Sequence, residues 1–207
     1  MKLVVFGAQG GIGRQVVEQA LTAGHTVTAV VRRPSEMTLQ HERLEIVKGD
    51  VLEPASIQAA IAGKDAVVSA LGIKNRAPTT VYSQGVANII QAMNAAHVRR
   101  LMCISASGLD PGPLWQRVIA KPLLWMILKE MYSDLARMET VVKASNLDWT
   151  IMRPPQFTDG PHTGRYQTSV NQHLARGRSI SRADIADYIV THLDDRSTYR
   201  AWTEMAY

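Results

Sequence analysis

A stretch near the N-terminus, residues 2–24, constrains the fold of this chain more than any other. It begins with the short apolar run Leu3–Phe6, which is typical of a buried parallel strand. Glycines spaced G-x-x-G-x-x-G follow at once, and apolar residues then recur at helical spacing until Gly24, where a glycine can end the helix. The stretch therefore predicts a strand, a glycine turn and a helix in direct succession. The glycines of the turn are Gly7, Gly10 and Gly13.

These three glycines have separate roles if the turn holds a phosphate group. Gly7 lets the chain leave the strand sharply, Gly10 removes the Cβ that would keep the backbone away from a pyrophosphate, and Gly13 lets the helix pack close to the strand. The start of the helix offers free N–H groups and a partial positive charge. We therefore predict nucleotide binding here, against the alternative of a tight turn without a ligand. The predicted contacts from the turn are Gly7, Ala8, Gln9, Gly10, Gly11, Ile12 and Gly13.

Length and residue usage narrow the class of protein. The 207 residues are enough for one α/β domain with a full core, and 46% hydrophobic and 20% charged residues are ordinary for a globular chain. Cys103 is the only cysteine and the six histidines lack the spacing of metal ligands. We therefore expect no disulfide within the chain and no metal site.

Charge and hydropathy favour a cytoplasmic protein. The net charge of +5 comes without a basic run, so we expect no nucleic-acid partner. Apolar runs are too short to span a membrane, and the N-terminus lacks the pattern of a signal peptide. The oligomeric state stays open between a monomer and a weak dimer.

Strands and helices alternate along most of the chain. Short connections between them favour a single domain over residues 1–207, with a Rossmann-type, doubly wound, mainly parallel sheet and helices on both faces. After the first helix, strands are predicted over residues 26–31, 44–47, 66–71, 101–105 and 149–152, and helices over residues 54–62, 80–96 and 113–144, with a break or kink at Pro122.

The pattern loosens after Pro154. A loop rich in proline and glycine covers residues 154–164, and a polar segment follows it. A helix is predicted over residues 182–193 and an edge strand over residues 199–203. We assign residues 154–207 to the substrate side of the same domain.

Ligands of such sheets bind beyond the carboxyl ends of the strands, and several segments of this chain meet there. Asp50 follows the third strand, where it can accept a hydrogen bond from an adenine amino group or cap a turn. The remaining predicted cofactor contacts at these strand ends are Asp50, Val51, Ala70, Leu71, Gly72, Ser105, Arg153 and Pro154.

The end of the second strand indicates which dinucleotide is bound. An NAD site usually has an acidic residue about 20 residues beyond the glycines, for the ribose 2′-hydroxyl. Arg32 and Arg33 stand at that place, and guanidinium groups pair well with a 2′-phosphate. We therefore predict NADP(H), against the alternative that both arginines are solvated loop charges.

Several motifs occur together along the chain: GAQGGIG, VVRRP, GDV at 49–51, SALG at 69–72, PTTVYSQGVANIIQAM at 78–93, LDWTIMRP at 147–154 and TGRY at 163–166. Together they resemble the atypical short-chain dehydrogenase/reductases, and more closely their NAD(P)H-binding branch that contains biliverdin reductase B, also called flavin reductase. The resemblance implies a Rossmann fold, NADPH as hydride donor and an open pocket for flavins or other planar conjugated molecules. The same superfamily holds NmrA-like redox sensors.

The catalytic chemistry is less clear than the cofactor site. Most short-chain dehydrogenases use Tyr-x-x-x-Lys, but Ala136 stands four residues after Tyr132. Ser105 follows the fifth strand as the active-site serine of the resembled branch does, although it is equally suited to a turn. Gln156 follows paired prolines where that branch has a histidine, and glutamine holds no ionisable proton near neutral pH. This departure puts tetrapyrrole reduction in doubt more than flavin reduction.

Two hypotheses for function follow. The first is an NADPH-dependent oxidoreductase that transfers hydride to a flavin, a quinone or a similar planar acceptor, with Ser105 and Gln156 as candidate catalytic residues. The alternative is an NmrA-like, non-catalytic regulatory protein that senses NADP(H). Residues 110–132 can form a lid over a planar substrate or simply pack as an amphipathic helix. Among the histidines, only His162 is a candidate for testing, because it lies in the loop rich in proline and glycine beside the predicted pocket.

Overall fold

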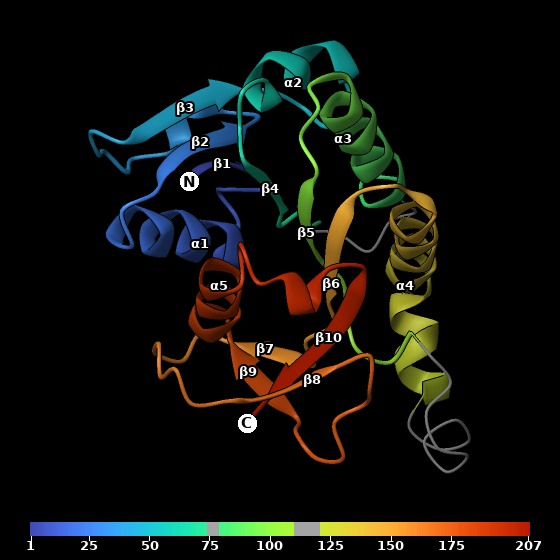
Figure 1. Ribbon diagram of the computed structural model, residues 1–207. Coiled ribbons are helices and arrows are strands. Elements are labelled where there is room, and N and C mark those ends of the chain that lie inside the picture. Colours follow the sequence, from blue (N-terminus) through green and yellow to red (C-terminus); the bar gives the residue numbers. More distant parts are fainter. Residues whose placement is uncertain (74–78, 110–120) are drawn as a thin grey trace.

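The structure, a computed structural model, describes residues 1–73, 79–109 and 121–207, and only the backbone of residues 121–128. Strands and helices alternate from the N-terminus to β6, as the sequence predicts, except between β2 and β3, where only a 3-10 turn (Pro34–Glu36) intervenes (Figure 1). The part of the predicted long helix over residues 113–120 lies outside the described residues, so the kink at Pro122 stays a prediction. The elements up to this point are β1 (Lys2–Phe6), α1 (Gly11–Thr22), β2 (Thr26–Val31), β3 (Leu44–Lys48), α2 (Pro54–Ile61), β4 (Ala66–Ser69), α3 (Ser83–Ala95), β5 (Arg100–Ile104), α4 (Lys121–Ala144) and β6 (Asp148–Met152).

The main sheet has eight strands in the order β3-β2-β1-β4-β5-β6-β10-β8. Its strands run parallel from β3 to β10, and β8 is antiparallel to β10. The strand order reverses beside β1, which has β2 on one side and β4 on the other. This reversal opens a crevice beyond the carboxyl ends of β1 and β4. The prediction of a Rossmann-type, doubly wound sheet is confirmed.

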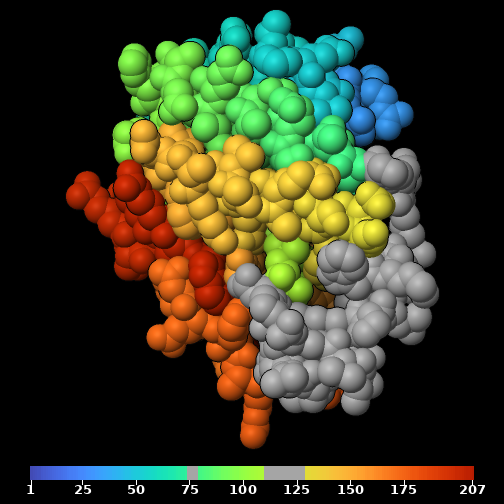
Figure 2. Space-filling view, turned by 90° about the vertical axis from the view of Figure 1, so that its right-hand side faces the viewer, coloured from blue at the N-terminus to red at the C-terminus, as the bar shows by residue number. Residues whose placement is uncertain are grey.

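Helices cover both faces of the sheet. Helices α1 and α5 (Arg182–Thr191) lie side by side on one face, and α2, α3 and α4 cover the other (Figure 1). Figure 2 shows the second face, with α4 as a yellow to gold band below the green α3. After the exposed Lys2, strand β1 is apolar because it packs on both sides: Leu3 and Val5 join the core with α1 and α5, whereas Val4 and Phe6 join the opposite core.

Helix α5 is held at both of its ends. At its start, Gln19 of α1 donates a hydrogen bond to the carbonyl oxygen of Ala183, at 2.8 Å. At its end, the buried guanidinium of Arg100 donates to the carbonyl oxygens of His192 and Leu193, at 2.9 and 2.8 Å. A cation suits this place because the last carbonyl groups of a helix carry partial negative charge. The first residues of α5 are therefore set rigidly against α1.

The C-terminal part corrects the expectation for residues 154–207. The strand predicted at the sheet edge over residues 199–203 is β10 (Ala201–Ala206), and it lies inside the sheet between β6 and β8. The edge strand is β8 (Gln167–Val170), in the segment that seemed only polar, because its side chains are mostly exposed and carry no apolar period. The expected loop contains β7 (Gln156–Thr158), which pairs with β9 (Ser179–Ser181) in a separate small sheet.

Candidate functional site

In the glycine turn between β1 and α1, backbone segments pack so closely that Gly7 and Gly13 have no room for a side chain. Gly7 has a φ of +76°, and a Cβ there would lie 2.2 Å from the carbonyl oxygen of Ala70. A Cβ on Gly13 would lie 2.2 Å from the carbonyl oxygen of Gly7. A side chain at either position would therefore push α1 or the end of β4 away. A Cβ on Gly10 would be less crowded, at 3.2 Å from the same oxygen of Gly7.

The start of α1 has the features of an anion site. Gly10 is the N-cap residue and brings no side-chain hydrogen bond, and the first turn contains no acidic residue. The N–H of Arg14 is the first to reach back into the turn, at 2.9 Å from the carbonyl oxygen of Gly10. The exposed Gly10 and Gly11 thus leave the first-turn N–H groups accessible, which is the arrangement that binds phosphate in other proteins.

A small pocket adjoins this turn at the end of β2. Gln9 donates a hydrogen bond to the carbonyl oxygen of Arg33 at 2.9 Å, and Arg33 forms an ion pair with Glu36 at 2.7 Å. Arg32 is exposed beside them. Sequence reasoning missed Glu36, although its position three residues after Arg33 is a signal for such a pair. The pocket is lined by Ala8, Gln9, Arg14, Glu36, Met37, Thr38 and Leu39.

The loop after β3 is fixed by α3. Asn88, which is buried, donates to the carbonyl oxygen of Val51 at 2.7 Å, and a Cβ on Gly85 would lie 2.7 Å from a methyl group of Val51. Asp50 accepts a hydrogen bond from the N–H of Leu52 at 3.0 Å, so it caps this turn. A contact of Asp50 with adenine stays a prediction.

A buried ionic network lies behind the ends of β5 and β6. Ser105 donates a hydrogen bond to Glu139 of α4 at 2.8 Å, and Arg153 donates to the same carboxylate oxygen at 2.9 Å. All three residues are at most 3% exposed. Lys143 binds the second oxygen of Glu139 from the protein surface, at 2.9 Å. Burial raises the pKa of Glu139, but the hydrogen bonds from Arg153, Lys143 and Ser105 outweigh it, and the net pKa lies below its ordinary value.

This network decides what Ser105 can offer to a ligand. Because the Glu139 carboxylate only accepts hydrogen bonds, Ser105 must give its single proton to it. The hydroxyl oxygen can still accept a hydrogen bond. Arg153 also lies against the ring of Trp202, with 4.5 Å between its guanidinium carbon and the ring centroid. Its neighbour Pro154 accepts a hydrogen bond from the N–H of Ser107 at 2.9 Å, which closes the loops after β5 and β6 onto each other.

Tyr132 and Ala136 lie one helical turn apart on α4 but differ in exposure. Tyr132 is half-buried, and its hydroxyl group lies 3.4 Å from the carbonyl oxygen of Ser107. Ala136 is exposed, whereas Leu135 and Glu139 point into the core. The inward face of α4 therefore presents Tyr132 and Glu139, two helical turns apart. Of the segment 110–132, which we consider as a candidate lid, residues 110–120 lie outside the described residues and residues 121–128 are described by their backbone alone.

Gln156 stands at the start of β7 and Arg182 at the start of α5. Gln156 is exposed at the first position of β7. Arg182 forms an ion pair with Asp159, and a Cβ on Gly11 would lie only 2.6 Å from its Cδ atom. Sequence reasoning gave Arg182 and Asp159 no role. No local pattern pointed to them, because it is the packing of α5 on α1 that brings Arg182 to the glycine turn.

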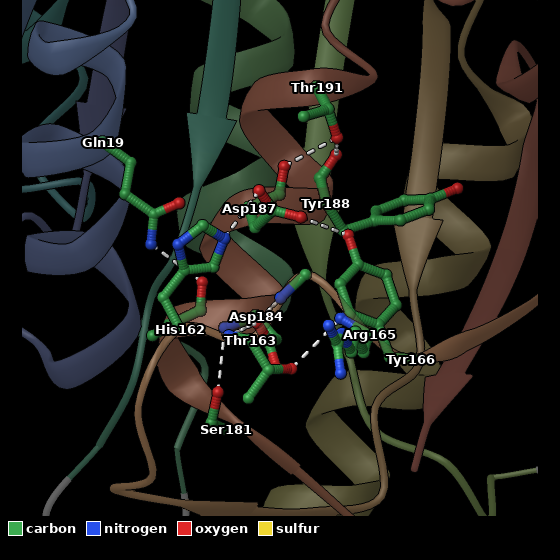
Figure 3. A network of polar contacts seen from close by, with 12 residues as sticks. Gln19, His162, Thr163, Arg165, Tyr166, Ser181, Asp184, Asp187, Tyr188 and Thr191 are labelled. Atoms are coloured by element: carbon green, nitrogen blue, oxygen red, sulfur yellow. Dashed lines mark hydrogen bonds and ion pairs between the residues drawn. The ribbon is translucent and has the colours of Figure 1, made fainter.

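A second polar network anchors the loop after β7 to α5 (Figure 3). Asp184 is fully buried and accepts hydrogen bonds from the N–H groups of Thr163 and Gly164, at 2.7 and 3.0 Å, and from the hydroxyl of Tyr207, at 2.6 Å. His162, half-exposed, contacts Asp187 at 2.9 Å. The His162 side chain is therefore paired with Asp187 of α5.

The described residues also bear on metal sites and on membrane-spanning helices. Among the described residues, no group of three or more His, Cys, Asp or Glu side chains could hold a metal ion. In the same part of the chain, no helix is both long enough and apolar enough to cross a membrane.

Comparison with known proteins agrees with this geometry. The sequence model of the NAD(P)H-binding family matches residues 7–196. The uncharacterized protein YwnB of Bacillus subtilis is 27% identical, over 94% of this chain and 92% of its own length. The uncharacterized sugar epimerase YhfK of the same organism is 28% identical, over 96% of this chain and 90% of its own.

Solved structures are similar over the whole chain. The "putative NADH-flavin reductase" of Streptococcus pneumoniae has a TM-score of 0.83 and 25% identity, covering 100% of this chain and 99% of its own. A short-chain dehydrogenase/reductase of Veillonella parvula, solved in complex with NADP, has a TM-score of 0.81 over 100% of this chain and 94% of its own. Its identity of 18% shows the fold alone.

Proposed function

Because the chain belongs to the NAD(P)H-binding family, we propose that it is an NADPH-dependent oxidoreductase that transfers hydride to a flavin, a quinone or a similar planar acceptor. One observation carries the proposal: an uncapped helix start follows a glycine turn at the point where the strand order reverses. Turn and helix start together fit a dinucleotide pyrophosphate. Similarity to a "putative NADH-flavin reductase" supports the choice of acceptor.

Each part of the cofactor has a proposed set of contacts. The turn from Gly7 to Gly13 holds the pyrophosphate, and the guanidinium groups of Arg32 and Arg33 hold the 2′-phosphate. The loop after β3 lies under the adenine. The ends of the next three strands hold the nicotinamide half, through Ala70, Leu71, Gly72, Ser105, Arg153 and Pro154.

The residues of this chain bind and orient rather than exchange protons. A bound reduced nicotinamide supplies the hydride, and the acceptor takes it up together with one proton. Ser105 serves as a hydrogen-bond acceptor for an N–H group of the ligand, since its own proton is directed to Glu139. Arg153 acts through Glu139 and keeps that carboxylate charged and in place. Gln156 offers an amide to the acceptor from the exposed start of β7.

A regulatory function is the second candidate. The same hydrogen bond from Ser105 to Glu139 favours it, because a hydroxyl group held in this way donates no proton to a substrate. A protein that senses NADP(H) needs different affinities for the two redox forms, but no turnover.

Titration followed by an acceptor screen tests the proposal. We expect quenching of tryptophan fluorescence by NADPH at lower concentrations than by NADH, and oxidation of NADPH with at least one flavin or quinone. Gly13→Val is the control, since its side chain would clash with the Gly7 carbonyl and abolish both signals. Binding without turnover across flavins, quinones and dicarbonyls would favour the sensor. Absence of dinucleotide binding would refute both candidates.

A further inference from the structure

Arg182 occupies the space beside Gly11 that a side chain at residue 11 would fill. A Cβ on Gly11 would lie 2.6 Å from the Cδ atom and 2.8 Å from the Nε atom of Arg182. Gly11 belongs to the first turn of α1, in a helical conformation open to any residue. Its lack of a side chain is therefore explained by the path of Arg182 and not by backbone strain. The guanidinium carbon would lie 3.7 Å from the same Cβ, so the guanidinium lies beside the first residue of α1, a helix whose N-cap residue makes no side-chain hydrogen bond.

A weakly held anion neutralises this guanidinium. Asp159 forms the ion pair with Arg182, and the side chains are 90% and 30% exposed respectively. An ion pair whose carboxylate is almost wholly in water contributes little stability and exchanges easily. The ring of Phe157 lies 5.8 Å from the guanidinium carbon and covers part of it. Arg182 is thus positioned by its surroundings, whereas Asp159 is free to be replaced by another anion.

The place of Arg182 relative to α1 is set by several independent contacts. Gln19 of α1 binds the carbonyl oxygen of Ala183, the next residue along α5 (Figure 3). Ser181 caps α5 by accepting from the N–H of Asp184 at 3.0 Å. Asp184 in turn binds Thr163 of the loop after β7. A cation held this firmly next to exposed helix N–H groups suits a ligand that carries adjacent phosphates.

We infer that Arg182 is a side-chain ligand of the dinucleotide pyrophosphate, and that Asp159 is an internal anion that the pyrophosphate displaces. The inference rests on the proposed function and assigns a residue to it that the glycine turn does not include. It separates two positive sites: Arg32 and Arg33 distinguish NADPH from NADH, whereas Arg182 strengthens the binding of both equally. It also means that the Asp159 carboxylate, directly after β7, competes with the cofactor pyrophosphate for Arg182.

Binding measurements on variants of both residues test this inference. Arg182→Gln should weaken NADPH and NADH by the same factor, about ten- to a hundredfold, because charge-assisted hydrogen bonds are lost. It should leave adenosine 2′-phosphate, which has no pyrophosphate, unaffected. Arg182→Lys should give an intermediate loss. Asp159→Asn should tighten both dinucleotides a few-fold, and should have no effect once Arg182 is replaced by glutamine.

The control is Arg196→Gln, which removes the same charge at the far end of α5. Melting temperatures of all variants show whether each is folded. Unchanged dinucleotide affinity of a folded Arg182→Gln variant would overturn the inference and leave the proposed function intact. Equal loss of adenosine 2′-phosphate binding would also overturn it, because the effect would then be a general one of charge. A native protein that binds no dinucleotide would refute the proposed function itself.

Discussion

At the scale of single residues, the proposed preference for NADPH depends on three charges at and after the end of β2. Arg32 and Arg33 are suited to a 2′-phosphate, but Arg33 is paired with Glu36 at 2.7 Å. Both partners are well exposed, so the pair contributes little stability and can open. A 2′-phosphate would have to compete with Glu36 for Arg33. The pair thus reduces the preference for NADPH that two arginines would otherwise produce.

Replacement of both arginines tests their part in the choice of cofactor. Arg32→Ala with Arg33→Ala should weaken NADPH about ten- to a hundredfold, since charge-assisted hydrogen bonds to the 2′-phosphate are lost. NADH, which lacks that phosphate, should bind almost as before. Isothermal titration of both dinucleotides measures the ratio.

Two companion variants sharpen this prediction. Glu36→Gln should act in the opposite direction and tighten NADPH, because it releases Arg33. Arg196→Ala with Arg200→Ala removes the same two charges elsewhere and should leave the ratio unchanged. If the double replacement of Arg32 and Arg33 left the preference as it was, their assignment to the 2′-phosphate would be wrong.

At the scale of elements, α4 connects two neighbours through buried carboxylates. Asp134, which is fully buried, accepts hydrogen bonds from the N–H groups of Tyr82 and Ser83 and from the Ser83 hydroxyl. It thereby caps α3, whose own N-cap residue makes no side-chain hydrogen bond. Glu139 performs the similar task of holding Ser105 and Arg153. A helix with an ordinary amphipathic pattern therefore carries two polar contacts that set its position.

Loss of the cap on α3 is expected to destabilise the protein. Asp134→Asn should lower the free energy of unfolding by roughly 1–3 kcal/mol, because a buried hydrogen-bond acceptor and the charge facing the helix start are lost. Urea denaturation followed by circular dichroism measures it.

Asp148→Asn is the matched control for this loss. Its carboxylate pairs with Arg99 at the surface, at 3.1 Å, and should matter by less than about 1 kcal/mol. Equal effects of the two variants would mean that Asp134 caps α3 no better than a surface charge would.

At the scale of the whole molecule, Asp184 connects the C-terminal segment to the body of the fold. It binds Thr163 and Gly164 of the loop after β7, and Tyr207 at the C-terminus. Burial raises the pKa of this carboxyl group, but the hydrogen bonds from these residues outweigh it and lower the pKa to about 2. The carboxylate form is therefore the one that stabilises the native state.

This shift predicts how stability depends on acid. A depressed pKa stabilises the folded state fully above the ordinary pKa near 4, and the contribution disappears as the pH falls toward 2. The contribution of the Asp184 carboxylate to the free energy of unfolding is about 2 kcal/mol. Melting temperatures between pH 5 and 2 should fall less steeply for Asp184→Asn than for the native protein. Asp194→Asn, an exposed control, should keep the native slope; a parallel fall in all three proteins would contradict the assignment.

Much of the fold was predictable because it depends on local patterns. Runs of four to six mostly apolar residues mark the strands up to β6, and the glycine spacing marks the turn where a Cβ on Gly7 or Gly13 would lie 2.2 Å from a carbonyl oxygen. The same patterns failed for β8, which is short, exposed and polar, and so misplaced β10 at the edge. Cytoplasmic location, oligomeric state and a substrate-side role of residues 154–207 stay predictions.

The candidate site also has a part that local sequence patterns predict and a part that they do not. The glycines, and likewise the two arginines after the second strand, form short local patterns, so their roles in binding could be predicted from the residues alone, and these roles stay predictions. The meeting of Arg182 with Gly11, of Glu139 with Ser105 and of Asp134 with α3 depends on how distant helices pack. Such contacts produce no periodicity or motif in the sequence. A charged residue is the same letter in the sequence whether its side chain is solvated or paired with a buried group. The proposed phosphate contacts of the glycine turn are therefore local in origin, whereas the position of Arg182 beside that turn and the contacts of Glu139 and Asp134 are tertiary.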